Sequence, residues 1–152
     1  CFVVSLTIYM EWIKITILIS AFWQLREINA SPFGAPLQAC ENMLAQHPPF
    51  GPQTTLPPIQ VIAPLDIPTG ETAQIIIRST GGAQFRGFLI QIRDFTTNIP
   101  GGRFLQQVDV NTLNCFDLPQ SAATHSNSQD KSEVVLEWEA PEVSVVTLFE
   151  IQ

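Results

Sequence analysis

Hydrophobic and polar positions alternate with a period of two along much of the chain after residue 70. Residues 72–79 ("TAQIIIRS") are rich in β-branched side chains, and residues 86–94 ("RGFLIQIRD") alternate apolar and polar side chains. This alternation is typical of strands that bury one face. Turn signals follow both segments, "STGGAQ" after the first and "NIPGG" after the second. The pattern predicts a protein built from β-strands.

The rest of the chain fits the same architecture. No stretch after residue 31 repeats apolar residues at helical spacing, and proline breaks up residues 31–70. We therefore expect an all-β fold, most simply an antiparallel sandwich of two sheets. The further predicted elements are an edge strand over 59–63, strands over 103–110, 111–115, 132–139 and 143–151, and a polar loop over 119–131.

In residues 86–94 the pattern assigns one face to the core and leaves the other largely to solvent. The predicted core face holds Phe88, Ile90 and Ile92, and the predicted outer face holds Leu89, Gln91 and Arg93. Residues 132–139 have a similar core stripe. We expect the arginines here to pair with acidic neighbours on the outer face, and Gly87 to mark a bulge or a close backbone approach.

Composition and charge limit the classes of function that the chain can have. Apolar residues make up 45% of the 152 residues and charged residues 14%, which suits one domain with a buried core. The formal net charge of −7 argues against a nucleic-acid partner, which needs clustered lysine and arginine. We expect no nucleic-acid binding.

The N-terminal residues form a separate segment. The chain begins at Cys1, and Met10 is a plausible true start, followed by Lys14 and the apolar run "ITILISAFW". A small residue, Ala30, ends this segment as signal peptidase requires. We favour residues 1–30 as a cleaved signal peptide with upstream residues. The alternative is a signal anchor over residues 2–23, but charges interrupt that run. Cleavage predicts a secreted chain without a membrane span.

Two cysteines, Cys40 and Cys115, remain after such a cleavage. Two cysteines in a secreted domain suggest one disulfide. Closing so long a loop is worth roughly 4–5 kcal/mol in loop-closure entropy.

A search for catalytic or metal-binding chemistry finds little. The chain has two histidines, and three or four suitable ligands are needed for a zinc site. His125, Ser126 and Asp130 can be written as a triad, yet no nucleophile elbow or oxyanion motif accompanies them. "DVNTLN" (109–114) lacks the glycine and final glutamate of a calcium loop, and no phosphate-binding loop is present. We expect neither an enzyme nor a cofactor.

A series of short motifs in a fixed order resembles the reeler, or reelin, domain family. The family pattern has a Gly-Ala-Pro, a cysteine and a methionine, then a Gly-Glu pair, then a strand containing Phe-x-Gly-Phe-Leu. The matching segments here are "GAPLQACENM" (34–43), "GE" (70–71), "FRGFLIQIR" (85–93), "GRF" (102–104), Cys115, "THS" (124–126), Lys131 and "WEAP" (138–141). Together they cover residues 33–151.

The resemblance implies an immunoglobulin-like β-sandwich in which Cys40 and Cys115 are bonded, in an extracellular setting. It also implies a domain over residues 31–152, and we expect a C-terminal truncation because the family pattern runs past "VTLFEIQ". Reeler domains occur in small secreted insect defence proteins that bind microbial surfaces. They also occur at the N-terminus of matrix proteins and of ferric-chelate-reductase-like membrane proteins.

Two functions follow from the resemblance. The first is a secreted defence protein that recognises microbial or cell-surface components, and the second is the N-terminal domain of a larger protein. Arg86, Arg93 and Arg103 are the candidate ligand-binding residues, because guanidinium groups suit anionic ligands. The simpler alternative is that these arginines only pair with acidic residues across neighbouring strands.

Overall fold

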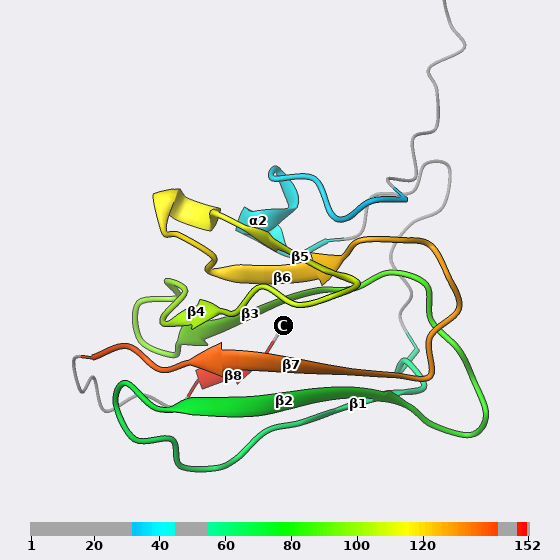
Figure 1. The fold of residues 1–152 in the computed structure, drawn as a ribbon, viewed down its shortest axis with the longest axis horizontal. Helices are drawn as coiled ribbons and strands as arrows, with labels where there is room; N and C mark the ends of the chain where they lie inside the picture. Colours follow the sequence, from blue (N-terminus) through cyan, green and yellow to red (C-terminus); the bar gives the residue numbers. More distant parts are fainter. Residues whose placement is uncertain (1–31, 45–54, 143–148, 152) are drawn as a thin grey trace, which may run out of the picture.

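The structure, a computed structural model, describes residues 32–44, 55–142 and 149–151. Two four-stranded antiparallel sheets face each other (Figure 1). The first has the order β1-β2-β7-β4, with β1 Ile59–Ile62, β2 Thr72–Ser79, β7 Glu133–Glu139 and β4 Arg103–Phe104. The second has the order β5-β6-β3-β8, with β5 Val110–Leu113, β6 Ala122–His125, β3 Leu89–Asp94 and β8 Phe149–Ile151. The expected β-sandwich is confirmed.

The core lies between the two sheets. Trp138 of β7 is fully buried, and its indole Nε1 donates a hydrogen bond to the Gly101 carbonyl oxygen at 3.1 Å. Ile75 of β2 and Ile90 of β3 reach the same core from opposite sheets. The predicted core faces of β3 and β7 are therefore confirmed. Burial of large apolar side chains from both sheets is the main stabilising contribution in such a sandwich.

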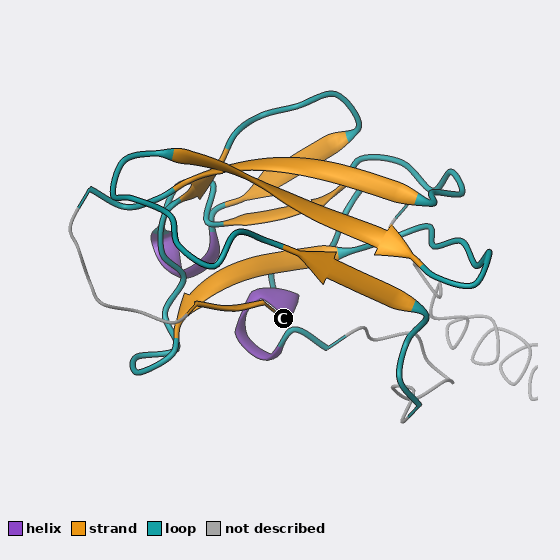
Figure 2. Cartoon of the chain, turned by 90° about the horizontal axis from the view of Figure 1, so that it is seen from below, coloured by secondary structure: helices purple, strands orange, loops and turns teal. Residues whose placement is uncertain are grey.

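Two short helices pack against each other beside the strands (Figure 2). They are α2 (Ala39–Asn42) and the 3₁₀ helix η1 (Cys115–Asp117). A disulfide joins Cys40 of α2 to Cys115 of η1, with their Cα atoms 5.6 Å apart. The predicted pairing is confirmed, and the disulfide links the two helices to each other. Among the described residues, no helix has the length and apolar character to cross a membrane.

Hydrogen bonds hold the arm before α2, residues 33–35, against the second sheet. Asn111 Nδ2 donates to the Phe33 carbonyl oxygen at 2.9 Å. Thr124 Oγ1 accepts from Ala35 N at 2.9 Å and donates to the Phe88 carbonyl oxygen at 2.6 Å. Gly34 has a φ of 125°, and an added Cβ would lie 3.0 Å from Thr124 Cγ2. The arm therefore needs a glycine at this contact.

Replacing Thr124 by valine is expected to loosen this arm. Valine keeps the shape but removes the hydrogen bonds of the buried Thr124 hydroxyl to Ala35 N and to the Phe88 carbonyl oxygen, so we expect a loss of about 1–2 kcal/mol in the free energy of unfolding. Urea unfolding measures the loss, and hydrogen exchange at Ala35 localises it. Thr112→Val is the control, since the Thr112 hydroxyl makes only a 3.4 Å contact with Gln106. Equal losses in both variants would contradict this role of Thr124.

Two predicted boundaries are wrong. The predicted strand over 103–110 is broken, since β4 ends at Phe104 and β5 begins at Val110. Between them Asp109 adopts a φ of 63°, which no strand accommodates. The predicted polar loop over 119–131 contains β6, because Ala122, Ala123 and Thr124 are fully buried between β5 and β3. Residues 1–31, with the predicted signal peptide, and residues 143–148 of the last predicted strand lie outside the described residues.

The predicted outer face of β3 is also wrong. Gln91 is fully buried and Arg93 is 2% exposed, although both were expected to face solvent. α2 covers this face. Arg93 Nη2 donates to the carbonyl oxygens of Cys40 and Glu41, the second at 3.3 Å, and Arg93 Nε donates to Gln91 Oε1 at 2.7 Å. Carbonyl oxygens at the end of a helix take a cation well, and this explains the buried arginine.

Candidate ligand-binding site

The structure separates the three candidate arginines. Arg86 is the most exposed, with 74% of its side chain accessible, and its Nε lies 2.7 Å from Asp130 Oδ1. Arg103 Nη2 lies 2.9 Å from Glu139 Oε2 across β4 and β7. Both confirm the predicted pairing with acidic neighbours. Arg93 is buried under α2 and cannot touch a ligand at the surface, so we withdraw it as a candidate.

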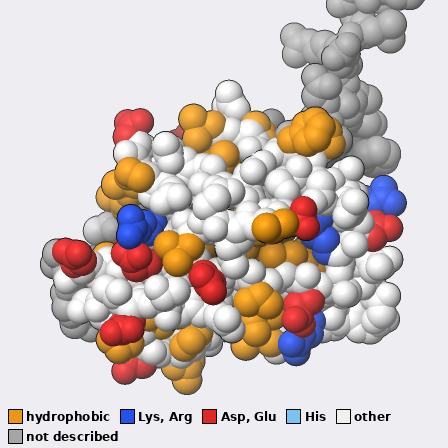
Figure 3. All heavy atoms as spheres, viewed as in Figure 1, with side chains coloured by type: hydrophobic (Ala, Val, Ile, Leu, Met, Phe, Trp, Pro, Cys, Tyr) orange, Lys and Arg blue, Asp and Glu red, His pale blue; other side chains and the backbone are white. Residues whose placement is uncertain are grey.

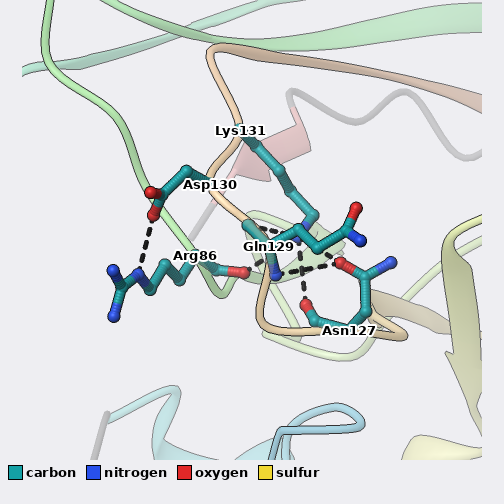
Figure 4. A network of polar contacts seen from close by, with 5 residues as sticks. All are labelled: Arg86, Asn127, Gln129, Asp130 and Lys131. Atoms are coloured by element: carbon teal, nitrogen blue, oxygen red, sulfur yellow. Dashed lines mark hydrogen bonds and ion pairs between the residues drawn. The ribbon is translucent and has the colours of Figure 1, made fainter.

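A lysine organises the loop beside Arg86 (Figure 4). Lys131 Nζ donates to the carbonyl oxygens of Asn127 at 3.0 Å, Gln129 at 2.8 Å and Arg86 at 3.1 Å. It also lies 3.0 Å from Asn127 Oδ1. The ammonium group therefore uses its donors within the protein. Its contacts hold the loop beside Arg86 in place.

Two further contacts make this loop rigid. Asn127 Nδ2 donates to Asp109 Oδ1 at 2.9 Å, and Gln129 N donates to Asn127 Oδ1 at 3.1 Å. The backbones of Phe85 and Lys131 also exchange two hydrogen bonds, at 2.9 and 2.8 Å. We call residues 126–131 together with Arg86 the Arg86 loop.

The guanidinium of Arg86 has a usable free edge. Asp130 engages Nε, and in Figure 4 the two Nη atoms point away from the loop. The hydrogen bond that Arg86 donates to Asp130, and then the charge of Asp130, raise the pKa of Arg86. The hydrogen bond that Arg103 donates to Glu139 raises the pKa of Arg103. Both side chains thus stay cationic. An Nη pair of this kind matches the spacing of carboxylate or phosphate oxygens.

The possible catalytic triad named from the sequence, His125, Ser126 and Asp130, makes other contacts in the structure. His125 Nδ1 lies 3.2 Å from Phe88 N, and Asp130 is bound to Arg86. The His125 ring covers Gly87, where an added Cβ would come within 2.9 Å of Cε1. The predicted close approach at Gly87 is confirmed, and the partner is a side chain. Within the described ranges, no three His, Cys, Asp or Glu residues gather as metal ligands.

Comparison with known families identifies the class of protein. A model of the Reeler domain matches residues 38–150, which covers most of the chain. The chain therefore belongs to the reeler domain family. Its fold is the two-sheet sandwich with the Cys40–Cys115 disulfide described above.

The individual relatives fall into two groups. The chain is 34% identical over 116 residues to "Putative defense protein 3" of Antheraea mylitta, covering 75% of this chain and 69% of that protein. It is 31% identical over 119 residues to "Ferric-chelate reductase 1" of Mus musculus, covering 75% of this chain and 19% of that protein. It is also 31% identical over 123 residues to "Putative ferric-chelate reductase 1 homolog" of Drosophila melanogaster, covering 72% of this chain and 18% of that protein.

Among solved structures, the Reelin-N domain of F-spondin is similar at 18% identity and a TM-score of 0.49. That similarity covers 59% of this chain and 68% of the other.

Sequence reasoning found Arg86 but missed what surrounds it. Lys131 belongs to the motif series, yet nothing in "NSQDK" shows that its ammonium is enclosed by carbonyl oxygens from two segments. The pairing of Arg86 with Asp130 spans 44 positions, so it depends on the fold.

Proposed function

We propose that this chain is a secreted, non-enzymatic binding module that acts in defence and recognises microbial surface components. The 34% identity to "Putative defense protein 3", over 69% of that protein, supports this proposal. The Arg86 loop supplies a contact of suitable chemistry, because it presents a cationic guanidinium from a rigid frame. We assign the ligand an anionic group, phosphate or carboxylate, on a bacterial glycolipid. On this assignment an uncharged β-glucan binds more weakly.

Binding to immobilised lipopolysaccharide tests the role of Arg86. We expect Arg86→Gln to weaken binding roughly tenfold, since one charge-assisted bidentate contact is lost. Laminarin, an uncharged β-glucan, serves as the comparison surface. Surface plasmon resonance at two salt concentrations measures both, and the arginine contribution should shrink as salt rises.

A matched control is available on the first sheet. Arg78 Nε contacts Glu133 Oε2 at 2.6 Å, which repeats the geometry of Arg86 with Asp130. Arg78→Gln removes an equal charge from a strand and should leave binding nearly unchanged. Equal losses in both variants would show unspecific attraction, and unchanged binding by Arg86→Gln would refute the assigned site. Absence of binding to any microbial surface would refute the defence function itself.

The alternative function is an accessory domain of a larger membrane protein. The 31% identity to ferric-chelate reductases supports this alternative. Sequencing the transcript in both directions distinguishes the two. Continuation into several membrane spans would overturn the proposal of a small secreted protein.

A further inference from the structure

Exposed apolar side chains gather at the end of the sandwich where β3 terminates. We call this group the apolar end, and its members are Phe95, Ile99, Phe116 and Leu118. The first two lie in the turn after β3, and the other two lie in η1 and directly after it. Figure 1 shows this turn and η1 at the same end of the molecule, on the left. Phe95 is 70% exposed and Phe116 is 47% exposed, which is high for aromatic side chains.

The Arg93 side chain contacts both the η1 segment and the turn after β3. Its Cζ lies 5.5 Å from the centre of the Phe116 ring, and its Nη1 donates to Asn98 Oδ1 at 3.2 Å. Asn98 belongs to the turn that carries Phe95 and Ile99. A single buried guanidinium therefore positions both halves of the apolar end, with a cation–π contact under Phe116.

The turn that carries Phe95 is rigid as well. Asp94 Oδ1 accepts from Thr96 N at 2.8 Å and from Thr97 N at 2.7 Å. Asn98 N donates to the Asp94 carbonyl oxygen at 2.8 Å. The exposed ring of Phe95 thus sits on an ordered turn, and little entropy is lost when a partner covers it.

Left-handed backbone also concentrates at this end. Six described non-glycine residues have a positive φ, and five of them lie in α2's cap, this turn or the η1 segment: Met43, Asn98, Phe116, Asp117 and Gln120. A phenylalanine at φ 56° is unusual, because its Cβ meets the following carbonyl. Strained residues persist where surrounding contacts hold them, and they are frequent at binding sites. Phe116 keeps this conformation although its ring lies outside the core.

Charge at this end selects the partner. Glu41 of α2 and Asp117 of η1 are exposed beside the apolar residues, and Arg93 is buried. Figure 3 shows acidic and hydrophobic side chains together at the upper left, over this end. Arg103, an exposed arginine of the first sheet, is paired with Glu139. An anionic membrane or a second copy of this chain would bring like charges together, given the net charge of −7.

We propose that the apolar end is a docking surface for a cationic amphipathic segment of a partner protein. The apolar face of such a segment would cover Phe95 and Phe116, and its basic face would meet Glu41 and Asp117. This surface is separate from the Arg86 loop: β6 starts beside η1 and ends at His125, near Gly87. A failure of microbial binding at the Arg86 loop would therefore not contradict this proposal.

Fluorescence anisotropy with a labelled helical peptide of leucine and lysine tests this surface. The oxidised full chain should bind it, and a matched peptide of leucine and glutamate should not bind. The double variant Phe95→Ser/Phe116→Asn should weaken binding roughly tenfold or more, since buried aromatics dominate interface energies. Asparagine tolerates the left-handed backbone at position 116, so the fold is retained and the thermal midpoint checks it.

Val108→Ser is the matched control. Val108 is 90% exposed, and it lies beside the Val110 end of β5, which pairs with His125 at the opposite end of the sandwich. Binding that survives Phe95→Ser/Phe116→Asn, or falls equally with Val108→Ser, overturns the proposal. Two other results overturn the assigned partner: stronger binding to phosphatidylglycerol vesicles than to the cationic peptide, and a dimer in sedimentation that Phe116→Asn dissolves.

Discussion

Replacing Cys40 and Cys115 together by alanine is expected to lower the free energy of unfolding by about 4 kcal/mol. The two cysteines are 75 residues apart, so the bond removes many conformations from the unfolded chain. A loss of this size is a large share of the net stability of a domain, which is about 5–15 kcal/mol. Urea unfolding followed by tryptophan fluorescence measures it, because Trp138 lies in the core.

Chemical reduction of the unmodified chain provides the control. Reduction should shift the urea midpoint by nearly the same amount as the double substitution, and reduction of the variant should shift nothing. A loss below about 1 kcal/mol would mean that the unfolded chain gains little freedom, contrary to the loop-closure argument.

Replacing Arg93 by methionine is expected to cost about 3 kcal/mol or more, because several acceptors lose a charged donor and hydrogen bonds to charged groups are worth about 1.5–3 kcal/mol each. Methionine fills similar space but leaves Gln91 Oε1 and the carbonyl oxygens of Cys40 and Glu41 without this donor. Buried acceptors that lose their donor carry a cost of desolvation, although the Cys40 carbonyl oxygen still accepts from Gln91 Nε2 at 3.3 Å. Hydrogen exchange should show faster opening in α2 and in the turn at Asn98, in addition to the loss in urea unfolding.

Two further arginine variants sharpen the test. Arg103→Met removes an exposed ion pair and should cost less than about 1 kcal/mol. Arg93→Lys should recover only part of the loss, because one ammonium cannot reproduce the planar fork that reaches Gln91, Asn98 and α2 at once. Equal losses of stability in Arg93→Met and Arg103→Met would show that the buried contacts of Arg93 add nothing to the free energy of unfolding.

The disulfide and Arg93 hold the same helix, so their effects should not add independently. Cys40 contributes its sulfur to one connection and its carbonyl oxygen to the other. Contacting residues of this kind couple in double-mutant cycles. We therefore expect α2 to stay on the second sheet after reduction, held by the hydrogen bonds of Arg93 and Gln91 to the Cys40 carbonyl oxygen.

Alternation along the chain was sufficient to place several strands and their core faces. β2 begins and ends where residues 72–79 predicted, and β7 begins one residue later than predicted. These two strands pair with each other and bury one face, so the local pattern matches the final environment. The motif series also led correctly to the family and to the disulfide. Of the arginines expected to be exposed, Arg86 and Arg103 are exposed and Arg93 is buried.

Contacts between distant segments decided the rest. A period of two shows that Gln91 and Arg93 share a face, but it cannot show that α2, some 50 residues earlier in the chain, covers that face. Thr124 and its alanine neighbours look like a polar loop, and become a buried strand only because β5 and β3 enclose them. The loop of Arg86 is ordered by a lysine whose acceptors come from two separate segments. Sequence pattern records which side chains share a face, whereas tertiary structure decides what lies against that face.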